Sequence, residues 1–439
     1  MAAAVRLQGT PAIAYRAGVA HSHVSTSAAD AGVRPVRTLW LLASAHAVNH
    51  ALAILLPLVY LEVIREMHVD AASIALLTAV GSLVSGAAQL GYSALTRVLS
   101  RRAILVVGGF LFGGGMALQG VVHSFGAFSA ANIASKIGAS PQHPVGNALL
   151  AEQFPPRRRG FAISAHISGG NVGTLAVPLI GTWLIAGIGW RNTVILFGIP
   201  AVLIAIAMAV LIRESGADRA AARAEGSLRN AFGRVLRDRD LLLLYFASMV
   251  AAGGRGLGVI TLFVPLYLSE VLRLDTTTIG WMYTVLLIGS VPAPLAAGWL
   301  SDRIGRRPVI VVAYVLAAAG MALFVLAGSN ALGIWSAIVV MSIFAYVESP
   351  QLQAILADIS PPGIRDAAFS TYFTLAFGIG SLWTAVFGVI LGAAGDTAGL
   401  PIVFWIMAAT FLAGGIAVLP IRTTARDEHT PLELPDPLV

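Results

Sequence analysis

The stretch from Gly298 to Leu326 reads GWLSDRIGRRPVIVVAYVLAAAGMALFVL. Its charged side chains all fall between Asp302 and Arg307, and none occurs from Pro308 to Leu326. An apolar run of this kind is long enough to cross a bilayer as a helix, which takes roughly 20 residues. Arginines gathered directly before such a run are typical of a loop on the cytoplasmic face of a membrane. The stretch therefore predicts a membrane-spanning helix that starts at that face.

The composition of the whole chain supports the same conclusion. Of the 439 residues, 57% are hydrophobic and only 11% are charged, whereas ordinary globular proteins have about 25% charged residues. So few charges cannot cover a soluble surface. The 46 glycines suit helices that pack closely in lipid, because small residues let backbones approach. We expect an all-α polytopic membrane protein.

Several classes of protein are excluded by what the sequence lacks. The absence of cysteine removes disulfides, thiolate nucleophiles and cysteine-ligated metal centres. The net charge of +7 comes with arginines between apolar spans, which indicates contact with anionic lipid and not with nucleic acid. Neither a phosphate-binding loop nor an H-E-x-x-H motif is present. We expect no enzyme, no catalytic residues, no cofactor and no metal site.

Apolar segments predict the domain organisation. Twelve qualify as membrane spans, and they cover residues 38–61, 72–95, 103–122, 127–152, 161–187, 190–212, 241–268, 277–300, 308–328, 331–357, 367–393 and 399–420. Residues 213–240 form a charged linker, which separates a first half (38–212) from a second half (241–420). Residues 1–37 and 421–439 are expected to be disordered tails.

The distribution of arginine predicts the orientation. Arg97, Arg101, the triplet 157–159 and the cluster 303–307 lie in loops on the same side as the linker and both termini. Short loops rich in Lys and Arg stay in the cytoplasm. We therefore expect a multi-pass protein of the plasma membrane, of the bacterial inner-membrane type, with both termini cytoplasmic.

The two halves are related by an internal sequence repeat. Pro144 matches Pro350, and the pair Pro155–Pro156 matches Pro361–Pro362, each 206 residues later. Arg97 and Arg101 match Arg303 and Arg307 at the same offset, and the first spans of the halves match at 208. Duplicated halves suit a transporter that rocks about a site at the membrane midplane.

Residues 298–307 resemble the G-x-L-[AS]-D-R-x-G-R-[KR] signature of the major facilitator superfamily. The resemblance implies twelve helices in two pseudo-symmetric six-helix halves, and a charged conformational gate. The gate residues it implies are Gly298, Asp302, Arg303, Gly305, Arg306 and Arg307, with Arg97 and Arg101 in the first-half copy. That copy departs from the signature, because Thr96 stands in place of the aspartate.

Three shorter stretches resemble the fosmidomycin-resistance family of exporters: His46–Asn49, Gly138–Pro144 and Gly169–Gly173, the last with Asn171 at its centre. Gly173, Pro178 and Gly181 also resemble a motif of antiporters. These resemblances imply efflux by antiport.

Polar residues inside the predicted spans are the candidates for function, since a charge at the bilayer centre costs roughly 3 kcal/mol or more. The fourth span carries Asn132, Lys136, Ser140, His143 and Asn147 at steps of four, four, three and four. That spacing places all five on one helix face, which must face protein or water.

Ionisable groups occur on the first, fourth, seventh and tenth spans, which line the central cavity in the superfamily. The candidate substrate-binding residues are His46, Asn49, His50, Asn132, Lys136, Ser140, His143, Asn147, Asn171 and Arg255. Lys136 and Arg255 against Glu348 leave the cavity net positive, which favours an anionic solute. Glu348 is the first proton-coupling candidate, and His50 is the second because imidazole changes charge near neutral pH.

Simpler interpretations exist for each group. Arg255 and Glu348 can form one structural ion pair, and Lys136 can extend to the membrane surface. His46 and His50 can be neutral hydrogen-bonding groups, and we expect His166 to be a packing residue.

The sequence thus predicts a monomeric secondary active transporter, coupled to protons, that moves a small organic solute, anionic or drug-like. Export is favoured. The alternatives are proton-coupled uptake of an organic anion and a non-transporting receptor or scaffold with the same fold.

Overall fold

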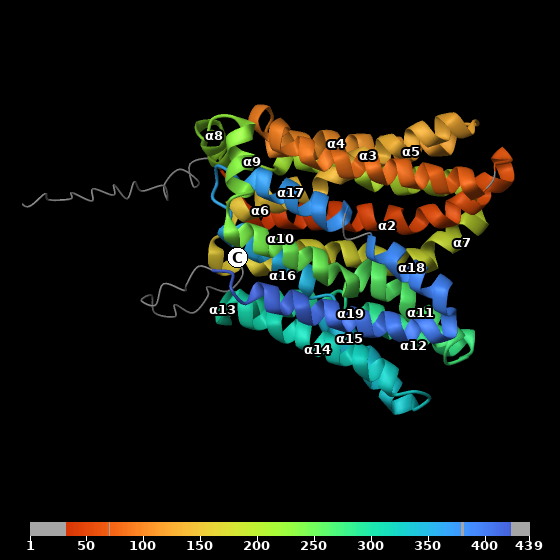
Figure 1. The fold of residues 1–439 in the computed structure, drawn as a ribbon. Helices are drawn as coiled ribbons and strands as arrows, with labels where there is room; N and C mark the ends of the chain where they lie inside the picture. Colours follow the sequence, from red (N-terminus) through yellow and green to blue (C-terminus); the bar gives the residue numbers. More distant parts are fainter. Residues whose placement is uncertain (1–31, 70, 379–381, 423–439) are drawn as a thin grey trace, which may run out of the picture.

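A computed structural model of the chain describes residues 32–69, 71–378 and 382–422, and these ranges hold helices and turns without any strand (Figure 1). The fold class expected from the sequence is confirmed. Most of the two predicted tails lies outside the described residues.

The first half contains seven helical elements. They are α2 (Pro35–Met67), α3 (Ala71–Val98), α4 (Arg101–Val121), α5 (Phe125–Ala139), the 3₁₀ turn η1 (Ser140–Gln142), α6 (Pro144–Gln153) and α7 (Pro156–Leu211). Ser100 and Ser124 begin α4 and α5 by accepting hydrogen bonds from the N–H groups of Ala103 and Ala127, as N-cap serines do. Gly189, with φ +77°, turns the chain within α7, so α7 supplies both the fifth and the sixth predicted span.

The linker forms two short helices, α8 (Ala217–Ala224) and α9 (Leu228–Val235). The second half then runs through α10 (Arg239–Ala251), η2 (Ala252–Gly254), the π-helical turn η3 (Gly256–Ile260), α11 (Thr261–Glu270), α12 (Thr276–Ile288), α13 (Pro292–Ile304), α14 (Arg306–Leu326), α15 (Ala331–Phe344), α16 (Glu348–Ile359), α17 (Arg365–Gly378), α18 (Leu382–Ala394) and α19 (Asp396–Val418). Within the described ranges, eight helical segments are apolar and long enough to cross a membrane.

Two spans that correspond in the repeat are interrupted at matching depths. The fourth span breaks at η1, between α5 and α6, and the tenth breaks between α15 and α16. Gln142 at the first break and Glu348 at the second are 206 residues apart. The seventh span is also interrupted, at η2 and η3. Such broken helices place polar backbone and side chains at mid-depth, where protein or water must surround them.

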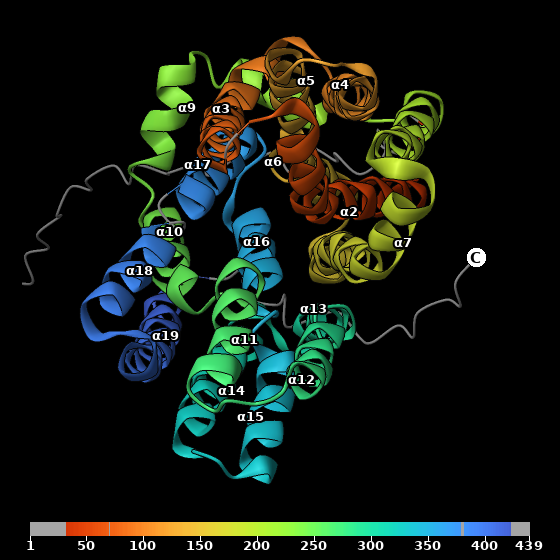
Figure 2. The ribbon, with the colours of Figure 1, turned by 90° about the vertical axis from the view of Figure 1, so that its right-hand side faces the viewer.

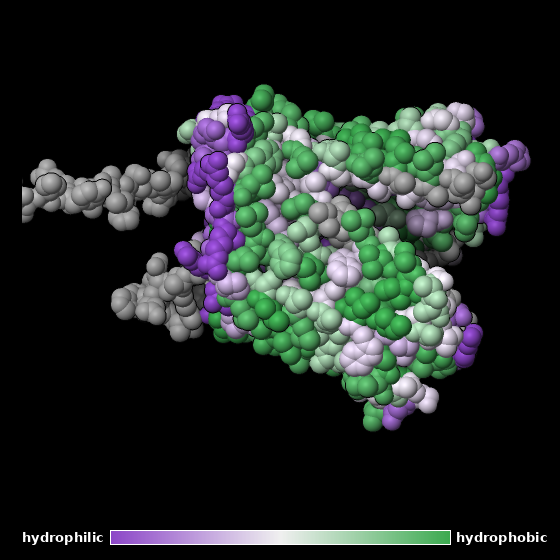
Figure 3. Space-filling view, viewed as in Figure 1, coloured by the Kyte–Doolittle hydropathy of each residue, from purple (hydrophilic) through white to green (hydrophobic). Residues whose placement is uncertain are grey.

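Seen from one end, the two halves form separate bundles, α2–α7 and α10–α19 (Figure 2). They meet where α7 packs on α13 and α3 packs on α17. The space-filling view shows a polar band at one end, apolar flanks, and a hollow between the halves that lies away from the band (Figure 3). We call the end with the band the arginine-rich end. It carries Arg97, Arg101, Arg159, Arg306 and the linker helices.

Candidate functional site

A cavity of about 120 Å³ lies between the two halves. The first half contributes His46, His50, His143, Ile167 and Asn171, and the second contributes Arg255, Gly256, Ala345, Tyr346, Glu348, Ser349, Gln353, Tyr372, Phe373 and Ala376. A cavity needs about 10–15 Å³ of such space to hold one water molecule, so this one has room for several. The first half thus lines the cavity with three imidazoles, and the second half lines it with Arg255 and Glu348.

Arg255 and Glu348 form an ion pair. Arg255 Nε donates to Glu348 Oε2 at 3.2 Å, and Nη2 donates to Oε1 at 3.2 Å. The Glu348 carboxylate is 1% exposed and the Arg255 side chain 16%. The break between η2 and η3 makes the contact possible, because Arg255 has an extended backbone there (φ −61°, ψ 136°).

Arg255 also donates to neutral groups. Nη2 reaches the carbonyl and hydroxyl oxygens of Ser248 at 3.3 and 3.2 Å, and Nη1 reaches the Ala376 carbonyl at 3.4 Å. The guanidinium is thus held by α10, α16 and α17 at once. Every one of these partners except Glu348 is neutral, so protonation of Glu348 would leave the cation without a counter-charge.

The prediction that the cavity carries a surplus of fixed positive charge is wrong. Lys136 lies against α3, where its Nζ donates to the Thr78 carbonyl at 3.3 Å, and it does not line the cavity. Arg255 and Glu348 balance each other. Any net positive charge must therefore come from the histidines or from a proton on Glu348.

Four histidines lie in contact: His46 and His50 of α2, His143 in the turn between η1 and α6, and His166 of α7. The ring centroid of His46 is 4.4 Å from that of His50, 4.6 Å from that of His143 and 4.6 Å from that of His166. His143 also contacts Phe373 of the second half, with ring centroids 5.1 Å apart. His166, which we expected to be a packing residue, packs on His46 in this cluster and does not line the cavity.

An amide pair joins the halves beside the cluster. Asn147 Nδ2 donates to Gln353 Oε1 at 2.5 Å, and the two residues are 206 positions apart. Equivalent residues of a duplicated fold can meet only close to the axis that relates the halves. Asn147 Oδ1 in turn contacts His166 Nδ1 at 2.8 Å, so the amide pair connects this axis with the histidines.

The polar stripe predicted on the fourth span does not form one face, because η1 interrupts the helix. Asn132 donates to Tyr60 and Gln119 inside the first half, and Ser140 bonds the Tyr92 hydroxyl at 2.5 Å. Only His143 of the five lines the cavity.

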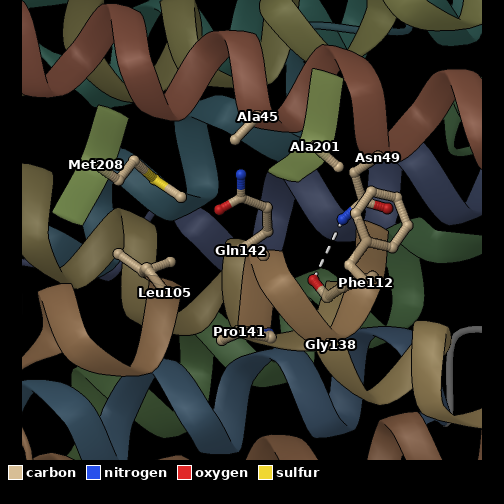
Figure 4. Close-up of a pocket in the computed structure, with 11 residues that line it drawn as sticks. Ala45, Asn49, Leu105, Phe112, Gly138, Pro141, Gln142, Ala201 and Met208 are labelled. Carbon is tan, nitrogen blue, oxygen red and sulfur yellow. Dashed lines mark hydrogen bonds between the residues drawn. The ribbon is translucent and has the colours of Figure 1, made fainter. Parts of the chain in front are cut away.

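Asn49 also lies away from the cavity. It lines a gap of about 20 Å³ inside the first half, and its Nδ2 donates to the Ala139 carbonyl at 3.2 Å (Figure 4). This gap has room for about one water molecule. Asn171, in contrast, lines the cavity and donates to the Ser290 carbonyl of the second half at 2.6 Å.

Two ion-pair clusters lie at the arginine-rich end. In the first, which we call the C-half cluster, Arg306 contacts Asp302 and Asp358, and Arg159 reaches Asp358 at 3.3 Å. Asp302 also accepts hydrogen bonds from the N–H groups of Gly160 and Phe161, at 3.0 and 2.8 Å. These bonds tie the start of α7 in the first half to α13 and α16 in the second.

The second group, the N-half cluster, surrounds Arg101. This guanidinium contacts Glu152 at 2.5 Å, Asp218 at 3.0 Å and Asp366 at 2.9 Å, and all four side chains are at most 8% exposed. Arg365 binds Asp218 at 2.6 Å. The linker helix α8 therefore supplies a buried carboxylate that contacts both halves.

The other predicted gate residues occupy distinct places. A Cβ on Gly298 would lie 2.6 Å from the Gly160 carbonyl oxygen, so glycine permits the close approach of α13 to α7. Gly305 has φ +97°, a conformation that glycine adopts without strain. Arg303 stacks on Trp299, Arg97 bonds the Gly226 carbonyl, and Arg307 bonds the Ile421 carbonyl. None of these three arginines forms an ion pair among the residues described.

The ion pairs that join the halves divide unequally along the molecule. At the arginine-rich end, Arg101–Asp366 and Arg159–Asp358 both cross from one half to the other. At the opposite end, Arg191–Glu66 and Arg273–Glu270 each stay within one half. In the described part of the chain, no ion pair bridges the halves there. The charges therefore hold only the arginine-rich end together.

Sequence reasoning did not single out Gln353, Asp218, Asp366 or Arg365, and it did not assign Glu152, Arg159 or Asp358 to the gate. The repeat offset could have found Gln353, because it is the counterpart of Asn147. No signal in the sequence pairs Asp218 or Asp366 with Arg101.

Comparison with known proteins gives consistent matches. The model of a family described as Major Facilitator Superfamily matches residues 39–276 and 244–438. The chain is 24% identical over 287 residues to the probable L-galactonate transporter of Escherichia coli (strain K12), which covers 61% of this chain and 62% of that one. The chain thus spans somewhat less than two thirds of that relative. It is 26% identical over 283 residues to the fosmidomycin resistance protein of the same organism, and the match covers 63% of this chain and 67% of that one.

A solved structure has the same fold. It is that of a proton:xylose symporter bound to 6-bromo-6-deoxy-D-glucose, with a TM-score of 0.72 and 15% identity, and the match covers 89% of this chain and 96% of that one.

Proposed function

Because the chain belongs to the major facilitator superfamily, we propose that it is a proton-coupled secondary active transporter of a small organic anion. The cavity between the halves is the proposed substrate site. The two ion-pair clusters are the proposed gate, which closes the arginine-rich end in the state described here. Following the arginine distribution, this end is the cytoplasmic one, in a bacterial plasma membrane, and the protein acts as a monomer.

The Arg255–Glu348 pair is the observation that carries the proposal. A buried guanidinium needs a counter-charge, because an unpaired charge in a low-dielectric site is strongly unfavourable. When Glu348 binds a proton, Arg255 loses that counter-charge. A carboxylate or phosphonate of a solute can replace it, with the planar bidentate geometry that guanidinium favours. Proton and anion then occupy the cavity together.

Simultaneous binding of proton and anion indicates symport. With protons flowing inward, symport brings the anion into the cell, so this geometry supports uptake better than export. Similarity to the L-galactonate transporter is in keeping with an organic acid as the solute.

Export of a drug-like anion is the second candidate. The similarity to the fosmidomycin resistance protein favours it. Export against an inward proton gradient needs antiport, in which proton and solute bind in turn. A test must therefore distinguish binding together from binding in turn.

The test uses full-length protein in proteoliposomes and a panel of radiolabelled organic acids that includes L-galactonate. An inside-alkaline gradient is expected to drive accumulation of one of them. Glu348→Gln, whose amide mimics the protonated acid, should abolish accumulation while solute exchange between equal pools persists. Glu270→Gln, at the opposite end from the clusters, is the matched control and should accumulate normally.

Two outcomes would contradict the proposal. Gradient-driven accumulation by Glu348→Gln would remove this carboxylate from the coupling step. Solute binding that weakens as Glu348 is neutralised would indicate competition between proton and solute, and would favour antiport.

A further inference from the structure

The imidazoles of His46, His50 and His143 face one another at the cavity wall. Their nitrogen ligand atoms all lie within 4.8 Å of one another. Tetrahedral zinc binds imidazole nitrogen at about 2.0–2.1 Å, which places two such nitrogens roughly 3.4 Å apart. Small side-chain rotations can bring three nitrogens at this separation onto one ion. We propose that these three histidines form a binding site for a divalent late first-row transition metal ion, with zinc as the representative ion.

Neighbouring groups orient two of the rings for this task. His46 Nδ1 lies 2.8 Å from the His166 carbonyl oxygen, which only accepts hydrogen bonds, so the proton of His46 is on Nδ1. Its Nε2 then carries a lone pair. This buried atom has no hydrogen-bond partner among the residues described.

His50 is oriented in the same way. His50 Nδ1 lies 3.2 Å from the Thr174 hydroxyl, which can accept from it while turned toward the Gly170 carbonyl at 3.5 Å. In that tautomer the lone pair of His50 is again on Nε2. Metal-binding histidines generally donate their other ring N–H to a carbonyl or similar acceptor, which fixes the ring and its tautomer. Both rings already have that arrangement without a metal.

The kind of donor selects the kind of ion. Imidazole nitrogen suits zinc, copper, iron and nickel, whereas magnesium and calcium require oxygen ligands. Glu348, the carboxylate that lines the same cavity, is engaged by Arg255. Three histidines with no carboxylate leave the bound ion its double positive charge. A fourth position that opens to the cavity can take water or an anionic group.

Binding of metal to purified protein tests the inference, and it needs no transport. Full-length, untagged protein in detergent is freed of metal and titrated with Zn²⁺ by calorimetry, and with Co²⁺ by its visible absorption. We expect one ion per chain and the intense absorption of tetrahedral Co²⁺. His46→Gln and His50→Gln should each weaken binding at least tenfold.

Matched controls come from the histidines outside the cluster. His68 and His123 are exposed, and His21, His23 and His429 complete the set. A variant with glutamine at these five positions should bind one ion as tightly as the natural sequence. Thr174→Val removes only the acceptor of His50 and should weaken binding about tenfold, as loss of such partners generally does. It therefore tests the site even if a histidine variant fails to fold.

Equal binding by the natural chain and a His46→Gln/His50→Gln double variant would overturn the inference, as would the absence of any stoichiometric ion. Because the readout is binding, this result is separate from the transport test. A chain that binds zinc but accumulates no solute would contradict only the proposed function.

Discussion

The two ion-pair clusters at the arginine-rich end share one pair of equivalent carboxylates, Glu152 and Asp358, but differ in their central arginines and in their other carboxylates. In the C-half cluster, Arg306 at the start of α14 is paired with Asp302, four residues earlier in α13, and with Asp358. In the N-half cluster, Arg101 has Glu152, the counterpart of Asp358, but Thr96 stands at the position of Asp302. Asp218 of the linker and Asp366 of the other half take its place.

This difference teaches that a buried arginine can be paired by carboxylates from distant parts of the chain where the local aspartate is absent. A local signature identifies the C-half cluster, because Asp302 and Arg306 are neighbours in sequence. The N-half cluster is built from four separate segments. Its three carboxylates all contact the single guanidinium of Arg101. We therefore expect the two clusters to respond differently to substitution.

Arg101→Ala is expected to have the largest effect. It leaves the carboxylates of Glu152, Asp218 and Asp366 buried, with Arg365 as the cation at Asp218. Removing one partner of a buried ion pair costs about 3–5 kcal/mol, and here three carboxylates lose a partner together. We expect a large fall in thermal stability in detergent, or opening of the arginine-rich end.

The opening can be measured directly because the chain has no cysteine. Spin labels on Arg158→Cys and Ile304→Cys, both exposed, report the distance between the halves at this end. An Arg101→Ala protein with unchanged stability and an unchanged distance would show that the N-half cluster does not hold the halves together.

Asp302→Asn is expected to have an intermediate effect. The amide keeps the size of the carboxylate but weakens the bonds from Gly160, Phe161 and Arg306, and hydrogen bonds that involve a charged group contribute about 1.5–3 kcal/mol each. We expect a wider distance distribution between the same labels and a slower transport cycle, with solute affinity within a few-fold of normal. A transport rate equal to that of the natural chain would remove Asp302 from the gate.

An exchange of carboxylates sharpens the comparison further. We expect Asp218 to serve in place of the aspartate that is absent at position 96. Asp218→Asn should then lower the free energy of unfolding less in a Thr96→Asp background than in the natural sequence. A double-mutant cycle on the free energy of unfolding measures this coupling, for which neighbouring groups give about 0.5–3 kcal/mol. Additive effects would mean that the two positions do not serve the same arginine.

Arg303→Ala should have the smallest effect, although Arg303 is part of the signature. Its guanidinium lies 3.5 Å from the centroid of the Trp299 ring, and exposed cation–π contacts contribute about 0.5–1 kcal/mol. We expect a change of a few degrees or less in melting temperature and normal solute flux. A loss as large as that of Asp302→Asn would give Arg303 a role that its contacts do not explain.

The course of the helices could be predicted well, because hydropathy and arginine position are properties of short segments. The apolar run after Arg307 predicts a span, and the matching positions of Pro144 and Pro350 predict the repeat. Hydropathy and arginine position do not predict the breaks at η1 and at η2–η3. These breaks decide which side chains reach the cavity.

The candidate site was therefore predicted in part. His46, His50, His143, Asn171, Arg255 and Glu348 do line one cavity. Asn132 and Ser140 bond partners inside the first half, and Lys136 points toward α3. The break at η1 gives the residues before it a different helical phase from His143 and Asn147 after it. Spacing along an assumed continuous helix cannot anticipate such a change of phase.

The contact of Asp218 with Arg101 and Arg365 makes the linker more than a tether between the halves. A plain tether could change in length or register around α8 with little effect on either half. A shift of α8 by one residue would instead move the Asp218 carboxylate away from a guanidinium in each half. The linker is therefore as constrained in register as a helix of the core.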